Sequence, residues 1–179
     1  SIAITETPEN IQIETGLISV FIPRHGDFLI DSLLYKGTKV GEKARLICNT
    51  QSEPIQENTS QISFTHYIGE IKSVTIERLG SVRALVKLEG IHRNRNKEID
   101  TNHSEGKGNY ANNSDMNKLN NREWLPFVVR LYFYGGSEQI KMVHSFVYDG
   151  DQKKDFIRSL GIRFDVPMRE ALYNLSLIH

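Results

Sequence analysis

Apolar and polar side chains alternate from Leu125 to Tyr134, and the alternation resumes after a Gly-Gly pair. Successive side chains of a β-strand point to opposite faces, so the pattern predicts two strands that are each apolar on one face. The apolar set of the first strand is Phe127, Val129, Leu131 and Phe133, and that of the second is Ile140, Met142, His144 and Phe146. Gly135 and Gly136 supply the positive φ of a tight turn, so the two strands are expected to form a hairpin.

The charged residues of this hairpin restrict its register. A shift of one residue would turn Arg130 and Lys141 into the core, which is costly. The next turn is predicted at Asp149-Gly150, after which apolar side chains alternate from Leu160 to Val166. Pro167 cannot donate to a strand ladder and is expected to end this third strand. The segment therefore predicts three consecutive antiparallel strands.

The first half of the chain shows the same rhythm of short strands. Further strands are predicted at Leu17–Ile22, Phe28–Tyr35, Ile62–Ile68, Ile71–Leu79 and Val82–Ile91, with shorter apolar stretches around Ile11, Ile13 and Leu46–Ile47. No apolar stripe with a 3.6-residue period lasts for three turns, and the best helix candidates are Asp151–Phe156 and Met168–Tyr173. The pattern predicts an all-β fold, either an antiparallel barrel or a sandwich, with short helical turns.

One polar segment interrupts the strands. His92–Arg122 is rich in Asn and nearly free of large apolar side chains. A connection of this length is unusual inside a compact domain, and such a composition does not favour a packed core. We expect a solvated insertion within a single β domain that covers residues 1–179. A loop that grips a ligand is the alternative.

Charge and composition narrow the classes of partner. The 179 residues include 22 Lys and Arg and 22 Asp and Glu, so the formal net charge is zero. This balance argues against a nucleic-acid or anionic-membrane partner recruited by bulk charge. No apolar run approaches the roughly 20 residues of a membrane span. Cys48 is the single cysteine, which excludes an internal disulfide. The compartment stays open, with periplasm or cytoplasm favoured over a membrane.

The residues that could carry chemistry do not form a recognisable catalytic, cofactor or metal motif. None of the six histidines pairs at HxH or HxxxH spacing; they are His25, His66, His92, His103, His144 and His179. His144 lies on the apolar face of its strand and is expected to be part-buried. Cys48 and His66 form a nominal nucleophile–base pair, but a buried inert thiol is the favoured interpretation.

Three acidic residues crowd the turn after the hairpin. Asp149, Asp151 and Asp155 could suggest a calcium loop, but the EF-hand ligand spacing is missing and two lysines lie between them. Turn chemistry, with Asp151 as a helix cap, accounts for these acids. Gly106-Lys107-Gly108 lacks the preceding strand and following helix of a phosphate-binding loop. The three N-x-Ser glycosylation sequons, at Asn58, Asn112 and Asn174, are expected by chance in an Asn-rich chain.

The outward face of the hairpin is the best candidate surface in the sequence. The residues expected on this face or beside it are Trp124, Arg130, Tyr132, Tyr134 and Lys141. Aromatic rings stack on sugar faces and a guanidinium binds a carboxylate through two hydrogen bonds, so an acidic oligosaccharide is a possible ligand. A half-exposed sheet face or a contact with another domain is the plainer alternative.

Several segments resemble one family of carbohydrate-active enzymes. Thr15–Val20, Arg130–Lys141, His144–Asp151 and Asp155–Phe164 are similar to segments of the exo-acting rhamnogalacturonan lyases and their YetA-like relatives. The resemblance implies the N-terminal β domain of that family, a RIFT-type barrel, followed in the longer proteins by a β-sandwich and an α/α toroid. Catalysis, a β-elimination at galacturonate, is expected in the toroid region. No catalytic residue therefore transfers to this chain.

Three functions remain open from the sequence. The first is a catalytically silent accessory β domain, whose partners are the downstream domains of the same polypeptide; the apolar tail Leu172–Ile178 fits such a contact. The second is a free-standing carbohydrate-binding or protein-interaction module that uses the hairpin face. The third, an autonomous enzyme, has the least support because no acid–base or nucleophile constellation is present.

Overall fold

The alternating segments form an antiparallel sheet in the computed structural model of the chain, which describes residues 1–53, 63–94 and 122–168. The strands of this described part are β1 (Ala3–Glu6), β2 (Asn10–Glu14), β3 (Ile18–Pro23), β4 (Ile30–Tyr35), β5 (Thr38–Gln51), β6 (Phe64–Leu79), β7 (Arg83–Asn94), β8 (Glu123–Tyr134), β9 (Ile140–Phe146) and β10 (Phe156–Asp165). Each strand from β1 to β9 pairs with the next along the chain, and β10 pairs with β5. These residues contain no helix, and the all-β prediction is confirmed.

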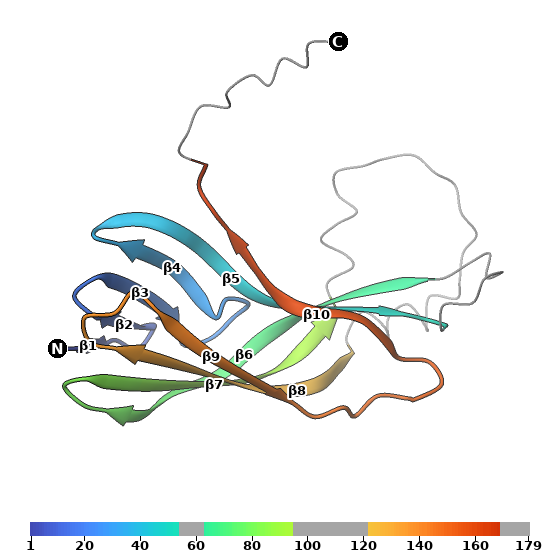
Figure 1. The fold of residues 1–179 in the computed structure, drawn as a ribbon. Coiled ribbons are helices and arrows are strands. Elements are labelled where there is room, and N and C mark those ends of the chain that lie inside the picture. Colours follow the sequence, from blue (N-terminus) through green and yellow to red (C-terminus); the bar gives the residue numbers. More distant parts are fainter. Residues whose placement is uncertain (54–62, 95–121, 169–179) are drawn as a thin grey trace, which may run out of the picture.

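The long strand β5 joins two layers of the fold. Its residues 38–44 pair with β4, and its residues 47–51 pair with β6. β10 pairs with residues 42–51 of β5, and many of these residues also pair with β4 or β6. A strand has two edges, so β10 lies along one edge of β5 and both β4 and β6 lie along the opposite edge. β4 and β6 therefore follow one another on a single edge of β5. The sheet bends there into a layer of β1–β4 and a layer of β6–β9 (Figure 1).

The main core contains the apolar faces of both layers. Its cluster includes Ile11, Ile13, Val20 and Ile22 from β2 and β3, and Val86, Leu88, Val129, Leu131 and Phe133 from β7 and β8, each at most 2% exposed. Complete burial of one such side chain contributes about 1.5–3 kcal/mol. Because one face of these four strands is buried in this way, the alternation in their sequences decides which side chains enter the core.

Backbone hydrogen bonds hold the two layers together at their open end. The amide of Gly136, in the β8–β9 turn, donates to the carbonyl of Thr15 in the other layer at 2.7 Å. The amide of Gly135 donates to Val82 at 2.8 Å and joins two turns within the β6–β9 layer. The amide of Ile2 donates to Ser81 at 3.0 Å. β1 and β9 nevertheless remain the two edges of the strand order, so the sheet is not closed. The structure is a sandwich made by folding one open sheet, and the barrel alternative is not observed.

The predicted β8–β9 hairpin is present in the predicted register. Leu131 pairs with Met142, and Tyr132 pairs with Lys141, so the two apolar sets share a face. The turn differs in detail because only Gly136 has a positive φ, of 75°. At Gly135 a Cβ would lie 3.3 Å from the backbone of Ser1, so a larger residue would require Ser1 to shift slightly.

Some predicted boundaries change in the structure. The segments Ile62–Ile68 and Ile71–Leu79 belong largely to one strand, β6, whose register shifts at two bulges where it pairs with β7. The mostly exposed edge strand β1 was not predicted, since its side chains show little apolar contrast. Asp151–Phe156 is no helix; a single hydrogen-bonded turn closes from the amide of Asp155 to the carbonyl of Asp151 at 2.8 Å.

Other predicted features lie partly or wholly outside the described residues. The central part of the Asn-rich insertion, residues 95–121, is among them, as are most of the second helix candidate and the apolar tail. Both ends of the insertion are described. His92 belongs to β7 and is completely buried, so the polar segment is shorter than the sequence suggested.

Gly90 provides a test of the packing between β6, β7 and β8. A Cβ at Gly90 would lie 2.0 Å from the carbonyl oxygen of Glu70 and 2.6 Å from Cζ of Phe127, so the backbone itself would have to move. We expect Gly90→Ala to lower the free energy of unfolding by about 3 kcal/mol. Gly161→Ala is the matched control, because a Cβ on that strand glycine meets nothing within 4 Å. Equal urea midpoints for the two variants would contradict the packing.

Candidate functional site

Four of the five residues assigned to the hairpin surface do lie on its outward face. Arg130, Tyr132 and Tyr134 are half-buried on β8, and Lys141 is exposed on β9. The ammonium of Lys141 lies 5.4 Å from the centre of the Tyr132 ring, a cation–π contact that covers part of the ring. The surface is therefore available to a ligand mainly around Tyr134 and the exposed edge of Tyr132.

The guanidinium of Arg130 already has a carboxylate partner. Its Nε and Nη2 donate to the two carboxylate oxygens of Glu77 at 3.0 and 3.3 Å. The hydrogen bonds from Arg130 hold the pKa of the Glu77 carboxyl below its ordinary value. Lys87, which lies between them on β7, approaches the same carboxylate at 3.8 Å. A ligand carboxylate would have to displace Glu77, so this face is poorly suited to an acidic sugar.

Trp124 does not lie on this face, and its assignment to the surface is corrected. Its side chain is 2% exposed, and the next residue, Leu125, is also buried. Leu125 has a φ of 53°, and the pairing of β8 with β7 shifts between Gly90 and His92. The resulting bulge turns two successive side chains inward and moves Trp124 off the outward face. Hydrogen bonds satisfy the bulge: the Leu125 amide donates to Asp149 Oδ1, and His92 Nδ1 donates to the Leu125 carbonyl, both at 2.7 Å.

Trp124 instead belongs to a second, smaller core with Cys48, Tyr67 and Leu125. Its ring meets the rings of Tyr67 and Tyr148 edge-on, with centroids 5.5 and 5.8 Å away. The guanidinium of Arg122 lies 4.7 Å from the centre of the indole. A Cβ on Gly150 would lie 2.6 Å from Cζ3 of Trp124, so only glycine fits where the turn crosses the indole.

Arg122 and Asp155 form the central ion pair of this region. Nη1 and Nη2 of Arg122 donate to the two carboxylate oxygens of Asp155 at 2.6 and 2.7 Å. These hydrogen bonds are the main reason that the pKa of Asp155 lies below its ordinary value. The amide of Asp151 donates to Asp155 Oδ2 at 2.7 Å, and the hydroxyl of Tyr148 donates to the Asp155 carbonyl at 2.9 Å. The pair therefore fixes the 149–155 turn to the start of β8.

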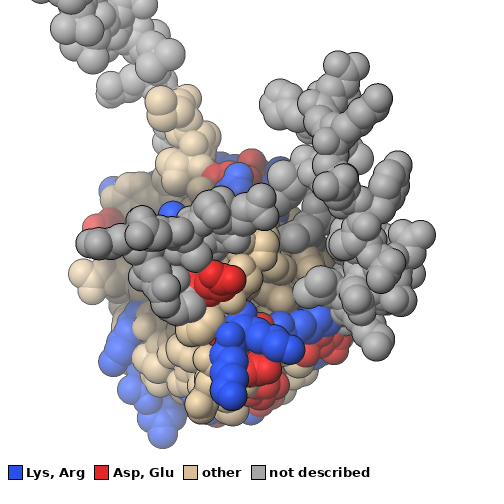
Figure 2. Space-filling view, turned by 90° about the vertical axis from the view of Figure 1, so that its right-hand side faces the viewer, with Lys and Arg blue, Asp and Glu red and all other residues tan. Residues whose placement is uncertain are grey.

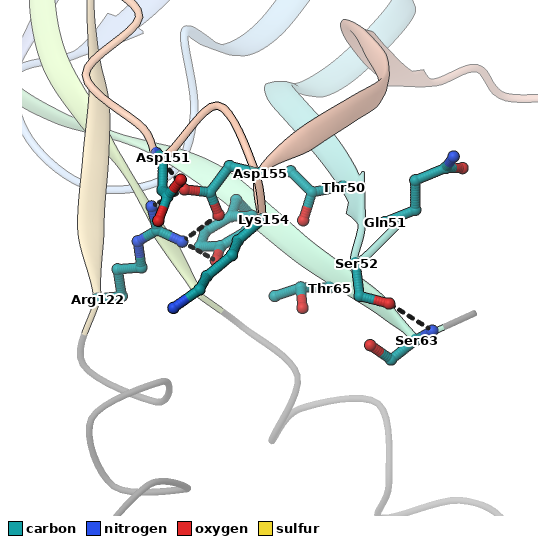
Figure 3. A pocket seen from close by; sticks show the side chains of 10 residues that line it. Thr50, Gln51, Ser52, Ser63, Thr65, Arg122, Asp151, Lys154 and Asp155 are labelled. Atoms are coloured by element: carbon teal, nitrogen blue, oxygen red, sulfur yellow. Dashed lines mark hydrogen bonds and ion pairs between the residues drawn. The ribbon is translucent and has the colours of Figure 1, made fainter. Parts of the chain in front are cut away.

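A cleft of about 350 Å³ opens beside this ion pair, and we name it the Arg122 cleft. Its lining comes from the end of β5, the start of β6, the residue before β8 and the 149–155 turn: Thr50, Gln51, Ser52, Ser63, Thr65, Tyr67, Arg122, Asp151, Lys154 and Asp155. Figure 3 shows the acids, Arg122 and Lys154 on one side and the Ser and Thr hydroxyls on the other. The sequence did not indicate this site, because its residues are brought together only by the β5–β6 pairing and the Arg122–Asp155 ion pair.

Figure 2 shows positive and negative side chains next to one another in the middle and at the right of the visible face, while its lower left edge carries positive side chains alone. The chain as a whole has a formal net charge of zero.

Cys48 and His66 do not form a catalytic pair. Cys48 pairs with Tyr67 across β5 and β6, whereas His66 pairs with Asn49, so the two side chains belong to opposite faces. Cys48 is completely buried, and burial raises the pKa of its thiol to about 11. The thiolate needed for nucleophilic chemistry is therefore scarce at neutral pH.

The three aspartates of the turn bind backbone amides. Asp149 accepts from Leu125, and Asp151 Oδ1 accepts from the amide of Lys153 at 2.8 Å. Asp155 accepts from Arg122 and from Asp151. The interpretation as turn chemistry is confirmed, although Asp151 caps a turn and not a helix. Within residues 1–53, 63–94 and 122–168, no three His, Cys, Asp or Glu side chains are arranged to hold a metal ion. The same residues contain no helix able to cross a membrane.

Comparisons with known proteins give two matches. A family model described as the PcRGLX-like protein central beta sandwich domain matches residues 2–176. The chain is also similar to the uncharacterized protein YetA of Bacillus subtilis strain 168, with 31% identity over 176 residues. That match covers 97% of this chain and 18% of YetA, so the chain spans less than a fifth of the length of this relative.

Two histidines, one buried (His92) and one half-buried (His144), make the stability of the fold depend on pH. Burial lowers the pKa of both His92 and His144 from the ordinary value of 6.5. Nδ1 of His92 donates to Leu125, while its Nε2 is buried without a partner among the described residues. A proton on Nε2 would be an unpaired buried donor, so the unfolded chain binds that proton more readily. The contribution of the neutral histidines to the free energy of unfolding is fully present above about pH 6.5. It is lost as the pH falls through the lowered pKa values of the folded state.

We expect His92→Asn to reduce this pH dependence. The amide of Asn can replace the hydrogen bond from Nδ1 to Leu125 but cannot titrate. Urea unfolding at about pH 7.5 and about pH 5 should show a smaller loss of stability for the variant than for the original chain. His25→Asn is the control because the side chain of His25 is exposed. An unchanged pH dependence in His92→Asn would show that protonation of His92 is not coupled to folding.

Proposed function

Because this chain belongs to the family of PcRGLX-like proteins, whose central beta sandwich domain matches residues 2–176, we propose that it is a non-catalytic supporting domain of a longer carbohydrate-processing enzyme. The family is the one that the sequence resemblance indicated. The domain within it differs, since the match is to the central β-sandwich and not to the N-terminal barrel-type domain. The folded open sheet agrees with the sandwich.

The apolar edge at β9 is the observation that carries the proposal. β9 is the last strand of the sheet order, so one side of its backbone has no neighbouring strand among residues 1–53, 63–94 and 122–168. Met142, Val143 and Phe146 are 38–44% exposed, and Val147 is 63% exposed. A groove of about 300 Å³ extends from the end of β9 across β8 to β7 and is lined by Glu89, Gly90, Pro126, Phe127, Val128, Ser145, Phe146 and Val147. We name these exposed apolar residues and the groove the β9 edge surface.

A neighbouring part of the same polypeptide is the occupant that we propose for the β9 edge surface. An unprotected apolar edge strand promotes aggregation, and proteins commonly cover such an edge. YetA is more than five times as long as the region that matches this chain, so a covering segment has ample sequence to come from. Downstream domains were the partners expected from the sequence, and they remain the proposed ones.

The chemistry of the described residues supports a silent domain. Cys48 is buried with a raised thiol pKa, and Asp155 is held by Arg122. The buried His92 and the half-buried His144 are bases with lowered pKa values. β-Elimination at a galacturonate needs a base beside the acidic carbon and a cation that stabilises the enolate. We propose that other domains supply these groups for rhamnogalacturonan, as the family resemblance implies, while this domain positions them.

A free-standing binding module is the second candidate. Tyr132, Tyr134 and Lys141 on the outward hairpin face favour it, since half-exposed aromatic rings can stack on sugars. The hydrogen bonds between Arg130 and Glu77 weaken the case for an acidic oligosaccharide on that face. Tyr132→Ala would remove the stacking ring, and saturable binding lost in this variant would favour the module.

The supporting role is tested by two measurements. The isolated chain should produce no unsaturated product from rhamnogalacturonan oligosaccharides, measured by ultraviolet absorbance; turnover would overturn the proposal. In full-length YetA, backbone amides at the positions that align with β9 should exchange with deuterium more slowly than in the matching region alone, because a covering segment pairs with the edge. Equal exchange at these positions would contradict an occupant, and amides of the buried strand β7 serve as the internal control.

A further inference from the structure

The Arg122 cleft has features of a binding site that are independent of the β9 edge surface. The cleft is lined by two cationic and two anionic side chains, so their formal charges cancel. The cations are Arg122 and Lys154, and the anions are Asp151 and Asp155. Asp155 already binds both terminal nitrogens of the guanidinium. A ligand anion would find no free guanidinium fork there. The charge balance therefore favours a neutral ligand.

The remaining polar groups of the cleft both donate and accept hydrogen bonds. Thr50, Ser52, Ser63 and Thr65 contribute hydroxyls, each able to act in either role. The ammonium of Lys154 makes no hydrogen bond or ion pair to another described residue, and Figure 3 shows it on the side of the cleft where Arg122 lies. An apolar ligand would bury these groups without partners, which is costly. Neighbouring hydroxyls of a sugar, which also donate and accept, satisfy such a mixed set.

The cleft is held in shape before any ligand arrives. Arg122 is fixed by Asp155 and by the indole of Trp124, and the amide of Ser63 donates to Ser52 Oγ at 3.2 Å. The volume of about 350 Å³ is at the small end of ligand pockets. It suits a single ring better than a long stretch of polymer. Rigid walls lower the ordering cost of binding.

We infer that the Arg122 cleft binds a neutral sugar ring through the ammonium of Lys154, the Ser and Thr hydroxyls and the carboxylate of Asp151. This inference deepens the proposed function and rests on it. It gives a domain of a carbohydrate-processing enzyme a site for an uncharged sugar residue of the polysaccharide. The hairpin face is not involved, since it lies on the outward side of β8 and contributes no residue to the cleft.

The test is a titration of the full 179-residue chain with a sugar, in which binding is monitored through the amide chemical shifts of the protein in NMR spectra. D-galactose and D-galacturonate serve as the ligands because they differ by one carboxylate. We expect galactose to bind saturably with a dissociation constant on the order of 1 mM, and to shift residues of β5, β6 and the 149–155 turn. Lys154→Met should weaken that binding about tenfold, the loss expected when a charged hydrogen bond is removed.

Two variants make the result specific. Lys153→Met, on the same turn but outside the cleft lining, should leave the affinity for galactose unchanged. Thr65→Val keeps the shape of the side chain and should weaken binding by removing one hydroxyl. Three results would each overturn the inference. They are the absence of saturable galactose binding, tighter binding of galacturonate than of galactose, and equal galactose affinity in Lys154→Met and Lys153→Met. The sugar titration can fail while backbone amides at the β9 positions of YetA still exchange slowly with deuterium. That result would overturn the sugar site and leave the supporting role in place, so the two proposals can be told apart.

Discussion

Burial of one face of the sheet against the other half of the same sheet is the interaction on which this fold depends. The apolar positions of β2 and β3 and those of β7 and β8 share one cluster, although they are far apart in the chain. The bend at β5 makes this possible, because β4 and β6 pair with successive parts of one strand. The outward faces are then free to carry charged side chains such as Arg130 and Glu77 without disturbing the core.

The second core, around Trp124, links the sheet to the candidate site. The bulge at Leu125 turns Trp124 inward, and Arg122 then lies over the indole while Asp155 holds its guanidinium. One local irregularity therefore removes an aromatic ring from the hairpin face and builds a wall of the Arg122 cleft. The β9 edge surface lies elsewhere, along the free edge of the sheet. Docking of a neighbouring domain and binding of a sugar can thus operate on separate surfaces.

Local patterns predicted the strands well, because alternation depends on near neighbours. The face formed by Phe127, Val129, Leu131 and Phe133 was visible in the sequence for this reason. Trp124 was misplaced because the bulge depends on a positive φ at Leu125 and on hydrogen bonds to His92 and Asp149, which are distant in the chain.

The Arg122 cleft was invisible in the sequence for a related reason. Arg122 and Asp155 are 33 positions apart, and no spacing rule connects them. Thr50 and Thr65 meet only through the β5–β6 register. The family resemblance identified the right family from short motifs but not the right domain within it, since β-strand motifs of this kind describe a sheet and not its position in a longer protein.

The pairing of β10 with β5 has a consequence for synthesis on the ribosome. β5 belongs to both layers, and β10 covers its outer edge along residues 42–51. β10 is also the last described strand to be translated. Until it emerges, the strand that connects the layers keeps one edge open to solvent, and a nascent chain in that condition is exposed to wrong pairing. Completion of this sandwich therefore awaits residue 165, and chaperone protection is most valuable in the interval before that point.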